Sequence, residues 1–322
     1  MTTLTGKDIF KAEEILLHGG LVAIPTETVY GLAANGLDNN AIAKIFEAKN
    51  RPFFDPLILH THSIENAFSF FDKVHSDFVK LAEAFWPGSL TLVGPKKDFI
   101  PDLLTAGSPL VAVRIPNHPL SLKLLERLKF PLAAPSANPF GYVSPTSAQH
   151  VLDQLDNKID YILDGGESLV GIESTIVGLQ NNKLEVWRLG GISKEDIEKV
   201  LGYSIPLVLH QNSNPNAPGQ LDKHYSPRKK ITLIDLSNFD FDTIKSDFAW
   251  LGYGHIPKLP VNCKEVLNLS ETGHTTEAAA NLYSYIRRLD NSEKISEIFS
   301  TSLPSQGLGD AINDRLKRAA SK

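Results

Sequence analysis

The chain contains very little cysteine and no long apolar run. Cys263 is the single cysteine among 322 residues, so neither an intramolecular disulfide nor a CxxC metal site can form. No apolar run approaches the roughly 18 residues that a membrane helix needs. The N-terminal sequence MTTLTGKDIF also lacks the apolar region of a signal peptide. We therefore expect a cytoplasmic protein in a reducing compartment, without membrane association.

Common nucleotide and hydrolase motifs are missing as well. The sequence has no GxxxxGK[ST] loop, no GxGxxG fingerprint, no GxSxG and no HExxH. His60 and His62 have no third ligand nearby in the sequence, so a metal site is not predicted there. The formal net charge of -5 argues against a surface built wholly for nucleic acid. With 42% hydrophobic and 21% charged residues, the composition is that of a globular protein with a sizeable core.

Apolar periodicity predicts an α/β protein with two folded parts. The first part has expected helices at 7–18, 40–49 (capped by Asn39), 76–85, 120–128 and 147–155, and expected strands at 21–24, 57–60, 90–94, 110–115, 132–134, 161–163, 174–179 and 184–188. These elements do not alternate strictly, which favours an open twisted mixed sheet.

A composition change near residue 205 separates the two parts. Residues 206–230 are rich in proline and asparagine and have no apolar face, so we expect a linker or a long functional loop. The pattern then restarts with expected strands at 231–236, 248–252 and 295–300 and helices at 276–289 and 309–320. The predicted organisation is a first domain at 1–205, the linker, and a small Rossmann-like α/β domain at 231–322.

Polar clusters follow several of the predicted core strands. They are PTETVYG (25–31), KNRPFFDPL (49–57), VAVRIPNHP (111–119), PLAAPSANPFGYVSPTS (131–147) and GIESTIVGL (171–179). Each cluster alone fits a turn or a helix cap; Thr26, for example, is a candidate cap of a following helix. Several such loops at one edge of an α/β sheet would instead build a polar concave site.

The cationic residues in these clusters allow two interpretations. Lys49 and Arg51 either complement a helix C-terminus or form a phosphate clamp. Arg114 shares one face of its strand with Leu110 and Ala112, and is either solvated or a carboxylate receptor in a cleft.

Taken together, the motifs resemble the YrdC-like family of threonylcarbamoyl-AMP synthases. The resemblance rests on PTETVYGLA, the KxR at 49–51, the SAN at 136–138 and the STIV at 174–177. PGQLDKHYSP at 218–227 and the ending at 303–320 resemble the long, two-domain form of that family. The resemblance implies that 1–205 is the catalytic domain and that 206–230 is a lid over its active site. The resemblance implies an open twisted α/β sheet and a nucleotidyltransferase that makes threonylcarbamoyl-AMP and pyrophosphate from L-threonine, bicarbonate or CO2, and ATP with Mg2+.

The resemblance also implies roles for particular residues. Those expected to bind L-threonine are Thr28, His60, Arg114, Ala134 and Ser174. Those expected to bind ATP are Lys49, Arg51, Asp55, Leu110, Ser136, Asn138, Ser144, Arg188 and Tyr225. No protein nucleophile is expected, since Lys49, Arg51 and Mg2+ would act by stabilising charge.

Two acidic residues are left open. Many relatives carry Asn at the position of Asp55, and an acid near a triphosphate needs Mg2+ or another donor opposite it. For Glu27 three possibilities are open: it orders its loop, helps to hold Mg2+, or does neither. Downstream, a threonylcarbamoyl-transferase would modify tRNA, and direct tRNA contact is an open expectation. Alternatives are an RNA-binding or ribosome-maturation module using the same cleft, and a subunit of a larger maturation enzyme.

Overall fold

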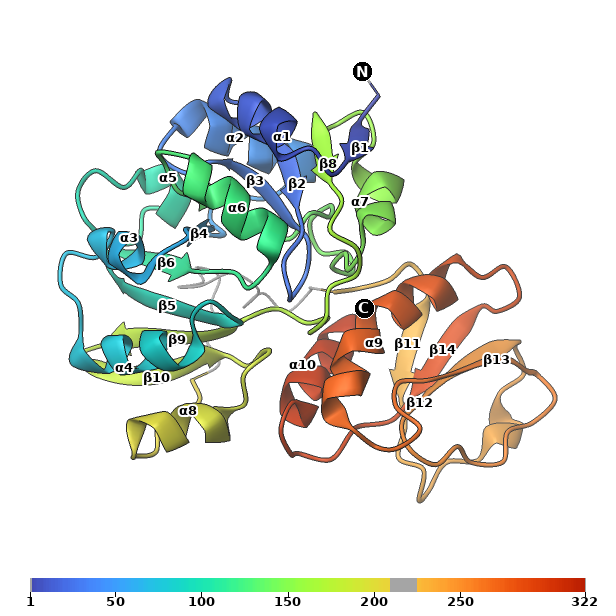
Figure 1. Cartoon of the computed structure of the whole chain (residues 1–322). Coiled ribbons are helices and arrows are strands. Elements are labelled where there is room, and N and C mark those ends of the chain that lie inside the picture. The colour runs from blue at the N-terminus through green and yellow to red at the C-terminus, as the bar shows by residue number, and fades with distance from the viewer. Residues whose placement is uncertain (1, 209–224, 322) are drawn as a thin grey trace.

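The computed structural model describes residues 2–208 and 225–321. The described chain forms two parts, each made of one sheet and its helices. The two parts lie side by side in Figure 1. The central stretch of the predicted linker, 209–224, lies outside the described residues. No described helix combines the length and apolar character that crossing a bilayer would require.

A ten-stranded mixed sheet organises the first part of the chain. Its strand order is β1-β8-β2-β3-β7-β4-β6-β5-β9-β10. Some neighbours, such as β4 and β6, are parallel, and others, such as β2 and β3, are antiparallel, which confirms the predicted mixed sheet. The strands are β1 (Leu4–Gly6), β2 (Val22–Ile24), β3 (Gly31–Asn35), β4 (Ile58–His60), β5 (Leu90–Pro95), β6 (Leu110–Arg114), β7 (Leu132–Ala133), β8 (Tyr161–Leu163), β9 (Thr175–Gln180) and β10 (Lys183–Arg188).

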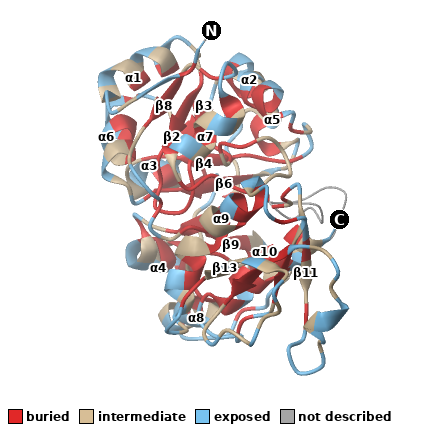
Figure 2. Cartoon of the chain, turned by 90° about the vertical axis from the view of Figure 1, so that its right-hand side faces the viewer, coloured by how far each residue is buried: buried red, intermediate tan, exposed pale blue. Residues whose placement is uncertain are grey.

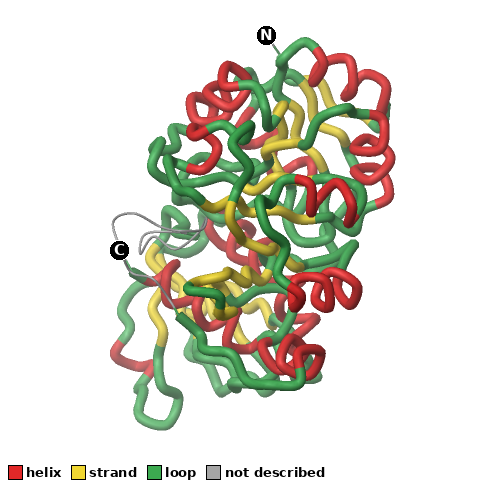
Figure 3. Tube along the Cα trace, turned by 90° about the vertical axis from the view of Figure 1, so that its left-hand side faces the viewer, coloured by secondary structure: helices red, strands yellow, loops and turns green. Residues whose placement is uncertain are grey.

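Helices cover the two faces of this sheet unevenly. On one face α1 and α6 pack with β2, β3 and β8, and on the other α2, α4, α7 and α8 enclose the larger core. Figure 3 shows these helices flanking the strands. On the face that α1 and α6 cover, the sheet around Ile58 and Ala112 carries only a small apolar cluster. This stretch of the sheet is therefore available to form a binding site. The helices are α1 (Ile9–Leu17), α2 (Asn39–Lys49), α3 (Ile64–Ser69), α4 (Ser76–Phe85), α5 (Asp102–Thr105), α6 (Pro119–Arg127), α7 (Ala148–Leu155) and α8 (Lys194–Leu201).

The structure corrects one predicted helix cap and excludes one alternative interpretation of a polar cluster. Asp38, not Asn39, caps α2, because its carboxylate accepts the Asn40 N–H at 2.9 Å. No helix follows PTETVYG: the chain enters strand β3 instead, and Thr26 caps a turn by accepting the N–H groups of Thr28 and Val29. The sequence GLAAN has little β-propensity of its own, and pairing with β2 and β7 on both sides makes it a strand.

The second part of the chain is a small parallel sheet of four strands in the order β11-β14-β12-β13. Its helices α9 and α10 lie between this sheet and the first part of the chain (Figure 1). The elements are β11 (Lys230–Leu233), the 3-10 helix η1 (Phe241–Thr243), β12 (Phe248–Gly252), β13 (Cys263–Asn268), α9 (Thr275–Asn291), β14 (Glu297–Ser300) and α10 (Gly309–Ala320). All the pairings are parallel, as expected of a Rossmann-like arrangement.

Apolar packing joins the two parts. Val29, Val143 and Ile172 from the first part belong to the same buried cluster as residues of α9 and α10. Figure 2 shows buried residues running through this contact. The loops that carry Val29, Val143 and Ile172 are three of the polar clusters singled out above, so the second part packs directly behind them.

Candidate active site

A pocket lies on the uncovered stretch of the large sheet, where β4, β6, β9 and β10 meet the loops of the polar clusters. It draws residues from all five clusters, which are far apart in sequence. Nine residues expected to bind substrates line it: Thr28, Arg51, His60, Arg114, Ala134, Ser136, Ser174, Arg188 and Tyr225. The other lining residues are Val29, Ile58, Pro135 and Glu173.

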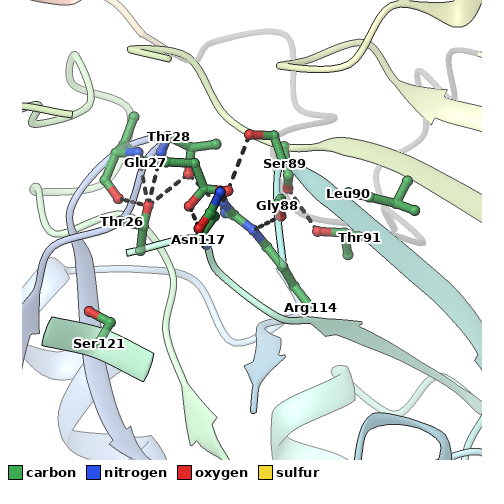
Figure 4. Close-up of polar contacts among 12 residues, drawn as sticks. Thr26, Glu27, Thr28, Gly88, Ser89, Leu90, Thr91, Arg114, Asn117 and Ser121 are labelled. Carbon is green, nitrogen blue, oxygen red and sulfur yellow. Dashed lines mark hydrogen bonds and ion pairs between the residues drawn. The ribbon is translucent and has the colours of Figure 1, made fainter. Parts of the chain in front are cut away.

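Arg114 forms one end of the pocket. It lies on the same strand face as Ala112, as predicted, and opposite His60 across the β4–β6 pairing. Its guanidinium donates to the Glu27 carboxylate at 2.6 Å, to the Thr28 hydroxyl at 2.8 Å and to the Gly88 carbonyl at 3.1 Å (Figure 4). These contacts fix the orientation of a cation in the pocket wall, which is the arrangement needed to receive a carboxylate.

Glu27 has a structural role in this arrangement. Besides Arg114, it accepts the Asn117 N–H at 2.9 Å and the Ser89 hydroxyl at 3.2 Å (Figure 4). The carboxylate is buried and does not line the pocket. Of the three possibilities raised by the sequence, these contacts match a residue that orders the loop around Arg114.

His60 is a neutral pocket residue. Burial and the nearby charge of Arg114 lower its pKa from 6.5 to about 3. One ring nitrogen, Nδ1, lies 3.2 Å from the Ile58 carbonyl, which favours a proton on that nitrogen. The main chain of Leu132 is a second hydrogen-bond partner of the ring.

Arg188 and Ser174 form another wall. The Arg188 guanidinium donates to the Ser174 carbonyl at 3.1 and 2.9 Å and to the Ser174 hydroxyl at 3.1 Å. The same hydroxyl lies 2.7 Å from that of Thr91 on β5. A β-bulge at Val186 to Arg188 in the pairing of β9 and β10 accompanies the turn of Arg188 toward the pocket.

Lys49 lies behind the pocket and does not line it. Its ammonium group donates to the carbonyls of Ser136 and Asn138, and the side chain is 1% exposed. Burial lowers the pKa of Lys49 well below its usual value. In this structure Lys49 holds the SAN loop in place, which neither interpretation of the sequence anticipated.

Arg51 lines the pocket, and an ion pair with Asp55 fixes the position of the Arg51 side chain. The Asp55 carboxylate lies 2.8 Å from the Arg51 guanidinium, which also donates to the carbonyls of Asp55 and Pro56. Asp55 is fully buried, and burial raises its pKa against the opposing effect of Arg51. The cation opposite this acid is therefore Arg51, held by an ion pair, since neither Asp55 carboxylate oxygen accepts a hydrogen bond from a described residue.

The remaining expected ATP ligands lie outside the pocket lining. Asn138 donates to the carbonyls of Pro139 and Tyr142, both at 2.9 Å, and so braces its own loop. Leu110 is at the start of β6, paired with Pro95. Ser144 is buried and donates to Glu173 at 2.6 Å.

Glu173 is the pocket residue that sequence reasoning missed. In the sequence, Glu173 is only an acidic residue that interrupts the apolar stretch 171–179. Its interaction partners come from distant segments, which the local sequence does not reveal. Burial raises its pKa, but the charges of Arg315 and Arg188 and the Ser144 hydrogen bond outweigh this and lower it to about 2. The described residues contain no group of three or more His, Cys, Asp or Glu placed to hold a metal ion.

The family models match both parts of the chain. Residues 14–190 match the Sua5/YciO/YrdC model, which is described as telomere recombination. Residues 192–321 match the model of the threonylcarbamoyl-AMP synthase C-terminal domain.

Similar proteins extend this match over the full length. A threonylcarbamoyl-AMP synthase of Pyrococcus abyssi is 39% identical over 96% of this chain and 93% of its own. One of Bacillus subtilis is 36% identical over 97% of this chain and 92% of its own. The crystal structure of P. abyssi Sua5 complexed with L-threonine superposes with a TM-score of 0.89, at 35% identity, over 99% of this chain and 97% of that one. The chain belongs to the threonylcarbamoyl-AMP synthase family, and within it to the two-domain form, as the motifs indicated.

Proposed function

We propose that this protein is an L-threonylcarbamoyladenylate synthase, a nucleotidyltransferase that forms threonylcarbamoyl-AMP and pyrophosphate from L-threonine, bicarbonate or CO2, and ATP. The observation that carries the proposal is one pocket lined by two kinds of group. Arg114, held by Glu27, suits an amino-acid carboxylate, while Arg51 and Arg188 suit phosphate oxygens. A P. abyssi relative that was crystallised with L-threonine has the same fold over nearly the whole chain.

We carry over to the pocket residues the roles that the resemblance to the family implies. Thr28, His60, Arg114, Ala134 and Ser174 are assigned to L-threonine. Arg51, Ser136, Arg188 and Tyr225 are assigned to ATP, supported from behind by Lys49, Asp55, Asn138 and Ser144. Leu110 remains a predicted main-chain contact.

The proposed reaction relies on positioning. Arg114 binds the carboxylate of threonine, and the threonine amine must be neutral to attack bicarbonate or CO2. The attack forms a carbamate and releases a proton when CO2 is attacked, or water when bicarbonate is attacked. Neutral His60 does not add to the cationic charge near the amine. A carbamate oxygen then attacks the α-phosphorus of ATP, and pyrophosphate leaves. Arg51 and Arg188 stabilise the charge that develops on the phosphates.

Mg2+ is proposed to enter with ATP. The carboxylates nearest the pocket already have partners: Glu27 pairs with Arg114, Asp55 with Arg51, and Glu173 with Arg315. Carboxylates that are already paired with arginines are poor metal ligands. These residues therefore fit a Mg2+ ion bound mainly by nucleotide phosphates better than one bound mainly by protein side chains. When bound, Mg2+ would neutralise phosphate charge.

A direct assay tests the proposal. The protein is incubated with ATP, bicarbonate, L-threonine and Mg2+, and pyrophosphate release is measured, with threonine omitted in a control and EDTA added in another. We expect release that requires threonine and is abolished by EDTA. Release without threonine, or none at all, would contradict the proposal, and tight RNA binding without turnover would favour an RNA-binding module. In the cell we propose cytoplasmic action upstream of a threonylcarbamoyl-transferase that acts on tRNA, with tRNA contact as a further test.

A further inference from the structure

Three buried side chains of the second part of the chain reach toward the pocket. Tyr283 and Arg287 come from α9, and Arg315 comes from α10; they are 0%, 5% and 0% exposed. Arg287 donates to the carbonyls of Val143 and Ser144. A buried cation or phenol is costly without partners, and these side chains find theirs in the loops of the first part.

Glu173 in the pocket wall is the main partner. Its carboxylate lies 3.2 Å from the Arg315 guanidinium and accepts the Tyr283 hydroxyl at 2.8 Å. It also accepts the Ser144 hydroxyl at 2.6 Å. A single buried carboxylate thus links the pocket to both helices of the second part.

Tyr225 is held by the same two side chains. Its ring stacks on that of Tyr283, with centroids 5.6 Å apart and planes inclined by 25°. The Arg315 guanidinium lies over the Tyr225 ring, 5.5 Å from its centroid. Two lining residues of the pocket, Glu173 and Tyr225, therefore depend on the second part for their position.

The charges indicate what this arrangement does. Glu173 is an anion that interacts electrostatically with two cations, Arg188 in the pocket wall and Arg315 behind it. Arg315 compensates Glu173, so the positive charge of Arg188 is left to attract an anionic ligand. If Arg315 were neutral, Glu173 would instead cancel the field of Arg188 inside a low-dielectric site.

The contact between the two parts is too close to be incidental. Gly171 has a φ of +76°, and an added Cβ would lie 2.5 Å from the Ala279 carbonyl oxygen and from the Ala280 Cα. Only glycine allows the backbone of α9 to approach the Glu173 loop so closely.

We infer that Tyr283 and Arg315 are positioning residues for the nucleotide end of the pocket, so that the second domain completes the active site. They do so by neutralising Glu173 and by holding Tyr225 in the wall. This inference rests on the proposed function of the pocket.

Steady-state kinetics of the full-length protein test it with matched variants. For Arg315→Met we expect the KM for ATP to rise about tenfold or more, while the KM for threonine changes less than about threefold. Tyr283→Phe removes only the hydroxyl and should shift the same parameter in the same direction, by less. The controls are Arg288→Met and Tyr285→Phe on α9, because Arg288 is exposed and Tyr285 does not line the pocket. Both should behave as wild type.

A double variant separates charge compensation from simple loss of packing. Glu173→Gln in the Arg315→Met protein removes both members of the Glu173–Arg315 pair, so no uncompensated anion opposes Arg188 and most of the ATP affinity should be recovered. It also remains informative if Arg315→Met alone folds poorly. An equal rise in both KM values, an unchanged KM for ATP in Arg315→Met and Tyr283→Phe, or a double variant no better than Arg315→Met would overturn the inference.

Calorimetry with a non-hydrolysable ATP analogue distinguishes this inference from the proposed function. A wild-type protein that binds the analogue but releases no threonine-dependent pyrophosphate would refute the reaction alone. Weaker binding by Arg315→Met than by Arg288→Met would then still support the positioning role. If Arg315→Met and Arg288→Met bound the analogue with equal affinity, the positioning role would be overturned, whether or not the protein turns over substrate.

Discussion

Replacing Glu27 with alanine should destabilise the protein strongly, whereas the same change at Glu13 should have little effect. Both carboxylates lie 2.6 Å from an arginine nitrogen, so distance does not distinguish them. Burial does: the Arg114 and Glu27 side chains are 5% and 7% exposed, while those of Arg127 and Glu13 are 40% and 17% exposed.

The magnitude follows from what each substitution leaves behind. Without Glu27, a buried guanidinium, the Asn117 N–H and the Ser89 hydroxyl lose an acceptor. Breaking a buried ion pair on one side costs about 3–5 kcal/mol. The Glu13 pair with Arg127 is partly exposed to solvent and should contribute about 0–1 kcal/mol.

Urea unfolding at pH 7, followed by circular dichroism, measures both free energies of unfolding. Glu27→Gln should fall between wild type and Glu27→Ala, because the amide keeps one acceptor for Arg114 but turns a donor toward its neighbours. The KM for threonine should rise in both Glu27 variants, since Arg114 loses its orientation. Equal free energies for Glu27→Ala and Glu13→Ala would refute the argument that burial decides the strength of these pairs.

Three further predictions concern other parts of the site. Lys49→Met should lower the free energy of unfolding by about 2–4 kcal/mol in urea titrations and raise the KM for ATP, because two buried carbonyls of the SAN loop lose their donor. The pKa of His60 is about 3 in the folded protein and near 6.5 in the unfolded chain, so protonation favours unfolding as the pH falls below 6.5. Between pH 6.5 and about pH 5, the free energy of unfolding of wild type should fall by about 2 kcal/mol more than that of His60→Gln. Equal slopes of unfolding free energy against pH in the two proteins would contradict this. Gly190→Ala would place a Cβ 2.3 Å from the Glu173 carbonyl oxygen, and should unfold the protein or lower its stability by more than about 3 kcal/mol. Gly202→Ala has open space around the added Cβ, so only its positive φ should lower the stability, by about 1 kcal/mol. Thermal melts of the two variants measure this difference.

Much of the fold could be predicted from periodicity, and the exceptions have physical causes. α4, β8, β12 and α10 have the predicted bounds because their apolar patterns are regular and their ends carry breakers or caps. β3 and β13 were missed because GLAAN and CKEVLN have no clear period-2 pattern of β-branched residues. Both become strands through pairing with neighbours that are not evident from the local sequence.

The candidate site could be predicted in part. Polar residues directly after core strands gave most of the pocket lining, because strand ends at one sheet edge meet in space. The support behind it could not be predicted. Arg315 lies 142 positions from Glu173, and no local pattern on α10 distinguishes it from Arg318 one turn later.

The buried acids that stood out in the sequence share one physical task. Glu27 holds Arg114, Asp55 holds Arg51, and each pair leaves the guanidinium in the pocket wall while the carboxylate lies behind it. Glu173 shows the reverse order, with the acid in the wall and Arg315 behind. In each pair the desolvation of the cation is compensated when the chain folds, so the charge is already oriented before a ligand arrives. A loop with a lone arginine would instead have to be ordered on binding, at a cost in affinity. Acids at the mouths of core strands are therefore compatible with an anion-binding pocket, because they fix the cations that line it.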